Sequence, residues 1–137
     1  MQKRKASADE LIALILHGIE EVKGLDINIL DLREIDNTVC DYFVLCNGTS
    51  NTHVKAIVNS IQKTVSKAIH DKPWHVEGSE NAEWVLMDYG HVVIHVFYES
   101  TRSFYNLEGL WSDARRLQTE SMRQQVDRPN ENGDEAV

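Results

Sequence analysis

The chain has few cysteines and no long apolar run. Its two cysteines, Cys40 and Cys46, form no C-x-x-C pair, so a cysteine-based zinc site is excluded. No segment approaches the roughly 18 consecutive apolar residues that a membrane span needs. The basic N-terminus, M-Q-K-R-K, is not followed by an apolar segment long enough for a signal peptide. These absences predict a cytoplasmic protein that has no membrane partner.

Basic residues are also scarce. The chain has 14 Lys and Arg against 22 Asp and Glu, a formal net charge of -8. Nucleic-acid affinity comes largely from Lys and Arg displacing counterions, so direct nucleic-acid recognition is disfavoured and a basic protein partner is favoured. Hydrophobic residues make up 42% of the 137 residues, which is enough for the core of one domain.

Hydrophobic periodicity predicts the first five elements. A capping box at Ser7 and a 3.6-residue repeat predict a helix over residues 8–23. The clearest helical stripe covers residues 51–69, before Pro73. The segments predicted to be strands are 26–32, 41–47 and 74–77.

The segment E-W-V-L-M-D-Y-G-H-V-V-I-H-V-F-Y, residues 83–98, predicts a β-hairpin around Tyr89-Gly90. An even-length loop would place Asp88 opposite His91 and Trp84 opposite His95. One face then carries apolar residues that should meet core helices: Val85, Met87, Val92, Ile94 and Val96. The other face is mixed, as expected of a surface that contacts a partner: Trp84, Leu86, Asp88, His91, Val93, His95 and Phe97.

The C-terminal part predicts one last helical segment and a tail. Apolar spacing over residues 100–117 indicates one short helix, or two that are broken near Gly109. Residues 118–137 have five acidic against two basic residues and no apolar period, so we expect a disordered acidic tail. The predicted fold is therefore a single α/β domain over residues 1–117, in which helices pack on a mixed sheet of about five strands.

Asp88, His91 and His95 could form an acid–base pair or bind a divalent metal. The two histidines lie four residues apart on a strand, about 13 Å at roughly 3.3 Å per residue, which is too far for one ion to bridge easily. A surface ion pair beside the turn is the simpler interpretation. We expect no metal and no cofactor.

The turn Gly48-Thr49-Ser50 precedes a helix, where α/β folds bind phosphate. It matches neither G-x-x-x-x-G-K-[ST] nor G-x-G-x-x-G. Nucleotidyltransferases have a similar turn, but they need two acids one residue apart on the next strand, and no D-x-D or E-x-D follows at a suitable distance. The turn is therefore interpreted as a helix N-cap at Ser50, and we expect no enzyme.

Six sequence strings together resemble the ribosomal silencing factor family, also called the Iojap or oligomerisation-domain family. They are D-L-R (31–33), D-Y-F-V-L-C-N-G-T-S (41–50), H-V-K-A-I (53–57), E-G (77–78), W-V-L-M-D-Y-G-H-V-V-I-H-V-F (84–97) and R-S-F-Y-N-L-E-G-L-W-S-D-A (102–114). The resemblance covers roughly residues 8 to 114, and the last two strings are specific to the family. The acidic tail falls outside it.

The resemblance implies a fold and a function. The fold is a mixed sheet related to that of nucleotidyltransferases but without their catalytic acids. The function is translational repression under nutrient limitation: such proteins bind the large ribosomal subunit through its fourteenth ribosomal protein and block joining with the small subunit. They are also linked to large-subunit maturation, and homodimers are expected when the protein is free.

Aromatic residues and acids on the mixed hairpin face suit a basic ribosomal protein. We therefore expect the partner-binding residues to be Glu77, Trp84, Asp88, Tyr89, Tyr98, Arg102 and Tyr105. Arg102 could instead be a solvated helix cap. Two rival functions stay open: a nucleotidyltransferase-like or metal-dependent enzyme that uses Gly48–Ser50 with Asp88, and a self-associating scaffold.

Overall fold

The computed structural model describes residues 7–35, 38, 40–105 and 115–117, with residues 103–105 and 115–117 described by their backbone. The predicted tail over residues 118–137 lies outside this range. The elements in chain order are α1 (Ala8–Glu21), β1 (Leu25–Asp31), β2 (Tyr42–Gly48), α2 (Asn51–Ile69), β3 (His75–Glu77), β4 (Trp84–Asp88), β5 (Val92–Tyr98), α3 (Glu99–Tyr105) and β6 (Arg115–Leu117). None of the described helices is long and apolar enough to cross a membrane.

The strands form one mixed sheet in the order β3-β4-β5-β2-β1-β6. β2 and β5 pair in parallel, and all other neighbours are antiparallel. α2 carries the chain from β2 to the edge strand β3, and the chain returns through β4 to place β5 beside β2. The predicted mixed α/β fold is thus confirmed, with all five predicted strands present.

The two long helices begin and end where the sequence provides caps. The Ser7 hydroxyl accepts a hydrogen bond from the Glu10 backbone N–H at 3.1 Å, and Ser50 accepts one from the His53 N–H at 3.0 Å. These bonds satisfy N–H groups that have no partner in the first helical turn. α2 ends at Ile69, and its C-cap residue His70 adopts the left-handed conformation with φ of 55°.

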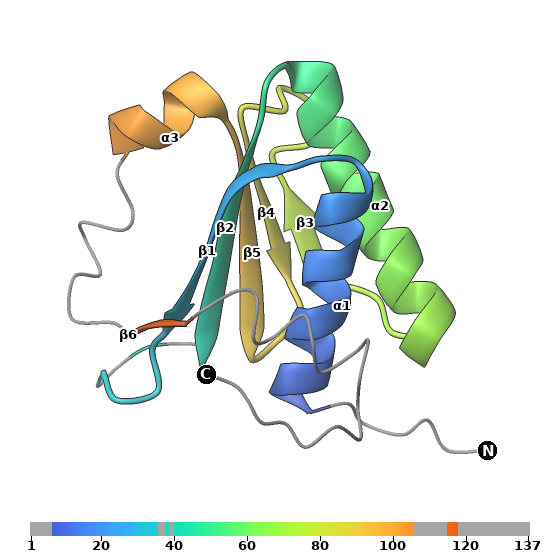
Figure 1. Cartoon of the computed structure of the whole chain (residues 1–137), viewed down its shortest axis with the longest axis vertical. Coiled ribbons are helices and arrows are strands. Elements are labelled where there is room, and N and C mark those ends of the chain that lie inside the picture. Colours follow the sequence, from blue (N-terminus) through green and yellow to red (C-terminus); the bar gives the residue numbers. More distant parts are fainter. Residues whose placement is uncertain (1–6, 36–37, 39, 106–114, 118–137) are drawn as a thin grey trace.

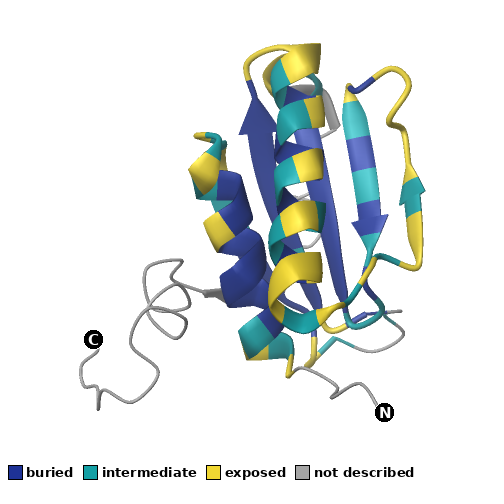
Figure 2. Cartoon of the chain, turned by 90° about the vertical axis from the view of Figure 1, so that its right-hand side faces the viewer, coloured by how far each residue is buried: buried dark blue, intermediate teal, exposed yellow. Residues whose placement is uncertain are grey.

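α1 and α2 lie side by side on one face of the sheet, which we call the helix face (Figure 1). They cross closely at Gly18, where a Cβ atom would lie 3.0 Å from the Ile61 Cα. The Ser60 hydroxyl donates a 2.6 Å hydrogen bond to the Gly18 carbonyl at the same point. Figure 2 shows the result, with the inner sides of both helices buried and their outer sides exposed.

The main core lies between these helices and the sheet. The hairpin residues that were predicted to meet core helices do so, since Val85, Met87, Val92, Ile94 and Val96 are all fully buried there. The opposite face of the sheet, here called the second face, has a smaller apolar cluster. Its buried members are Leu30, Leu32, Cys40, Leu45, Val93 and Phe97.

The predicted hairpin register is wrong by two residues. The strands pair Trp84 with Phe97, Leu86 with His95, and Asp88 with Val93. Because side chains alternate with a period of two, this shift leaves each strand residue on its predicted face.

The register differs because the turn is centred on Gly90-His91, one residue further along the chain than the predicted Tyr89-Gly90. It closes through the Tyr89 N–H, which donates to the Val92 carbonyl at 2.9 Å, and Gly90 adopts a φ of +98°. The Asp88 carboxylate accepts the Gly90 N–H at 2.8 Å. His91 therefore lies in the turn and not on the second face of a strand.

The C-terminal segment also differs from the prediction. α3 ends at Tyr105, and residues 115–117, which were predicted to be helical, form β6. β6 pairs antiparallel with β1, so the sheet has a sixth strand. The predicted break near Gly109 lies outside the described residues.

Candidate partner-binding surface

Besides His75, which pairs with Asp88, strands β3 and β4 place four side chains on the second face: Glu77, Trp84, Leu86 and Asp88. Glu77 pairs with Leu86, and the three β4 residues alternate onto the same side. Glu77 is exposed and the other three are half-buried. We call these four residues the Trp84 surface.

The β5 residues on the same face are less accessible. Val93, His95 and Phe97 have exposed fractions of 6%, 4% and 0%. The sequence predicted that this whole face would meet a partner, whereas only the part formed by β3 and β4 is open to one. The β5 residues instead form the layer on which the Trp84 surface is built.

Trp84 is held in place by this layer. Its indole stacks on the Phe97 ring at a centroid distance of 5.1 Å, as expected for cross-strand partners. Its Nε1–H donates a 3.0 Å hydrogen bond to Nδ1 of His95. The His95 ring in turn meets the Phe43 ring edge-on, with centroids 4.6 Å apart.

Burial controls the protonation of His95. Desolvation lowers the pKa of its imidazole to about 4, because the charged form is disfavoured away from water. His95 is therefore neutral at pH 7. Its Nε2 is buried and has no hydrogen-bond partner in the described part of the chain.

The two carboxylates of the Trp84 surface differ in their roles. Asp88 has one oxygen committed to the Gly90 N–H at 2.8 Å, so it also shapes the turn. Glu77 pairs with His75 at 2.5 Å between Oε2 and Nε2, and both side chains are more than half exposed. Exposed pairs contribute little stability, so Glu77 is available to a charged partner.

The structure places two of the predicted partner-binding tyrosines on the helix face. Tyr89 is 3% exposed, and burial raises the pKa of its hydroxyl well above the usual range. Tyr98 is half-buried and packs against the main core. Alternation could have shown this, since Tyr89 follows Met87 and Tyr98 follows Val96 onto that face. The side chain of Tyr105 lies outside the described residues.

Arg102 is buried, which excludes both the exposed contact and the solvated cap that the sequence allowed. Its exposed fraction is 8%, and its guanidinium donates to the Asn47 side-chain oxygen at 2.9 Å and to the Asp26 carbonyl. The Asn47 amide also donates to the Asp26 carboxylate at 3.0 Å. Arg102 thus ties α3 to the ends of β1 and β2, and it supports the fold from the interior.

Comparison with known proteins identifies the family. The profile described as "ribosomal silencing factor during starvation" matches residues 5–136. The chain belongs to the ribosomal silencing factor family. The Bacillus subtilis protein named "Ribosomal silencing factor RsfS" is 43% identical over 105 residues, covering 76% of this chain and 86% of that protein.

Two further relatives extend the comparison. A mouse protein named "Mitochondrial assembly of ribosomal large subunit protein 1" is 38% identical over 74 residues, which is 53% of this chain and 32% of that protein. The crystal structure of a Chromobacterium violaceum protein superposes with a TM-score of 0.73 at 34% identity, covering 78% of this chain and 88% of the other. The resemblance inferred from the sequence strings is therefore confirmed.

In this member of the family, the turn at Gly48–Ser50 has no free phosphate cradle. The Thr49 N–H donates to Nδ1 of His53 at 2.9 Å, and the His53 and Val54 N–H groups donate to Ser50. A Cβ at Gly48 would lie 2.9 Å from the Val54 nitrogen, so glycine is required by packing against the helix. This geometry agrees with the predicted role of the turn as an N-cap.

The described residues of this family member also form no cluster of three or more His, Cys, Asp or Glu side chains that could hold a metal. Burial raises the pKa of the Cys46 thiol to about 12, so it is no nucleophile near neutral pH.

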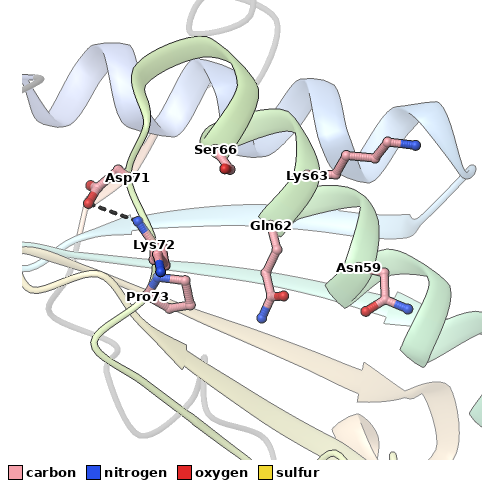
Figure 3. A pocket seen from close by; sticks show the side chains of 7 residues that line it. All are labelled: Asn59, Gln62, Lys63, Ser66, Asp71, Lys72 and Pro73. Carbon is pink, nitrogen blue, oxygen red and sulfur yellow. Dashed lines mark hydrogen bonds between the residues drawn. The ribbon is translucent and has the colours of Figure 1, made fainter.

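An open groove of about 480 Å³ lies between α2 and the segment before β3 (Figure 3). The residues that line it are Asn59, Gln62, Lys63, Ser66, Asp71, Lys72 and Pro73.

Proposed function

We propose that this ribosomal silencing factor represses translation by binding the large ribosomal subunit and blocking its joining with the small subunit. The contact is made with a basic protein of that subunit, the fourteenth, and repression acts chiefly when nutrients are scarce. The protein works in the cytoplasm as a binding factor and not as an enzyme. The names of its relatives, which refer to ribosomal silencing and to large-subunit assembly, support the ribosomal target.

The observation that carries the proposal is the Trp84 surface. A half-buried tryptophan held by Phe97 and His95 is a rigid apolar anchor, and such anchors dominate the binding energy of protein interfaces. The Glu77 and Asp88 carboxylates flank it on the same face. Carboxylates around a fixed indole complement a basic protein, and the net charge of -8 speeds encounter with one.

Three of the seven predicted partner-binding residues, Glu77, Trp84 and Asp88, remain in this proposal as direct contacts. Tyr98 can contribute only from the margin, since it packs on the helix face.

When the protein is free, we propose that it forms a homodimer, which analytical ultracentrifugation across a concentration range would detect. A monomer at micromolar concentration would contradict that part of the proposal.

The test is sedimentation of the purified protein with separated large subunits, separated small subunits and joined ribosomes. We expect comigration with free large subunits alone, and fewer joined ribosomes as the protein is added. No comigration at modest salt and micromolar protein would exclude the ribosomal target. A melting temperature raised by Mg²⁺ or by nucleotide would instead favour the enzyme alternative, because a ligand at 100 times its Kd stabilises by about 2.7 kcal/mol.

A further inference from the structure

His95 makes contacts that explain more than its place in the core. It is 4% exposed, and the centroid of its ring lies 4.6 Å from that of Phe43 and 6.3 Å from that of Phe97. Its neighbours in the second-face cluster, such as Leu45 and Val93, are apolar. An imidazole is therefore unusual among these neighbours, and its two ring nitrogens need an explanation.

The hydrogen bond to Trp84 fixes the imidazole tautomer. An indole nitrogen can only donate, so Nδ1 of His95 must accept, at 3.0 Å. A neutral imidazole carries one proton, which must then sit on Nε2. That N–H is buried without a hydrogen-bond partner among the described residues.

A buried donor without a partner costs free energy, whereas an apolar side chain of similar size would fill the same space without that cost. His95 is thus a poor choice for stability alone. What it supplies, and what a hydrocarbon side chain cannot supply, is an acceptor for the indole of Trp84.

We propose that His95 is a positioning residue of the partner-binding surface, whose Nδ1 fixes the Trp84 indole in the orientation that the partner recognises. This inference rests on the proposed function, since it assumes that Trp84 contacts the ribosomal partner. His95 itself is too buried to touch that partner.

The test uses two substitutions that separate the acceptor from the packing. His95→Leu fills the site with apolar atoms but offers no acceptor, while His95→Asn places its Oδ1 near the position of Nδ1 but is smaller and polar, so it packs less well against Phe43 and Phe97. We expect His95→Leu to keep or raise the melting temperature and to weaken large-subunit binding at least fivefold. We expect His95→Asn to lower the melting temperature and to bind within twofold of the unsubstituted protein.

The more stable variant, His95→Leu, is thus expected to bind more weakly than the less stable one, His95→Asn. If His95 had only a structural role, the less stable variant would bind more weakly. Trp84→Phe, which keeps a ring but removes the donor, should weaken binding about as much as His95→Leu, and the double variant should lose no more. The indole N–H resonance of Trp84 should shift further in His95→Leu, which offers no acceptor, than in His95→Asn, which keeps one. The chain has three tryptophans, so Trp84→Phe assigns this signal.

Each outcome has a distinct meaning. If the unsubstituted protein does not bind large subunits, the proposed function fails. If it binds, and either His95→Leu or Trp84→Phe binds as tightly as the unsubstituted protein, the positioning role of His95 is overturned while the proposed function stands. Should His95→Leu fail to fold, the binding of His95→Asn still decides the question, since a loss of more than twofold in that variant would overturn the positioning role.

Discussion

The two faces of the sheet are built from the same strands but differ in what they contain. On the helix face, side chains such as Val44, Val85 and Ile94 are fully buried against α1 and α2. On the second face, polar groups lie among the apolar ones: Asn47 and His95 are each 4% exposed, and Asp88 is half-buried. The first face supplies stability, while the second uses buried polar groups to orient side chains, at some cost in stability.

The largest expected effect breaks the helix face. Ile94→Ala removes a fully buried side chain between the sheet and the helices, so the free energy of unfolding should fall by about 2–5 kcal/mol. Urea denaturation measures this loss. The variant should bind its partner normally while it stays folded, because Ile94 does not contribute to the Trp84 surface.

The next effect belongs to the second face and depends on pH. The unfolded chain protonates His95 below pH 6.5, whereas the folded protein does so only near pH 4. The stability from this neutral histidine is complete above pH 6.5 and is lost as pH falls to about 4, a total of about 3 kcal/mol. Between these pH values the free energy of unfolding should depend less on pH in His95→Leu than in the unsubstituted protein. An equal dependence in the two proteins would contradict the lowered pKa of His95.

A smaller effect tests the contact between the two helices. Gly18→Ala places a methyl group 3.0 Å from the Ile61 Cα, so α1 and α2 must separate slightly. We expect a loss of about 1–3 kcal/mol in thermal or chemical unfolding. Gly24→Ala is no suitable control, because its Cβ would meet Ile19 at 2.4 Å; His17→Ala, on the exposed side of α1, serves instead and should change little.

The smallest expected effect on stability is at the rim of the Trp84 surface. Glu77→Gln removes an exposed charge paired with His75, so the free energy of unfolding should change by less than about 0.5 kcal/mol. Association with the partner should slow, and the salt dependence of its rate should weaken, because rim charges act mainly on encounter. Stopped-flow association at two salt concentrations measures this difference.

Much of the fold could be predicted from the sequence because it depends on local signals. The capping serines Ser7 and Ser50 and the apolar stripes predicted both long helices. The two-residue period assigned the strand residues of the hairpin to the correct faces even though the register was wrong, since a shift of two preserves each face. β6 was missed because three residues, R-R-L, are too few to show a strand period.

The candidate site was harder to predict because it depends on contacts between distant residues. Arg102 was expected at the surface, but its partners Asn47 and Asp26 come from two other strands. The sequence already predicted that Trp84 and His95 are neighbours, as directly opposite residues. In the structure Trp84 pairs with Phe97, and its indole nitrogen reaches the diagonal neighbour His95 on the same face. No local pattern encodes that bond.

In the proposed function, the second face binds the large subunit through Trp84 and Asp88. The most direct test compares the Kd for purified large subunits of three proteins: the unsubstituted chain, the double variant Trp84→Ala/Asp88→Ala, and Glu21→Ala, which removes one charge from α1 on the helix face. We predict that the double variant binds at least about tenfold more weakly, a loss of about 1.4 kcal/mol or more, and that Glu21→Ala stays within twofold. A folded double variant that binds as tightly as the unsubstituted chain would place the interface elsewhere and contradict the account.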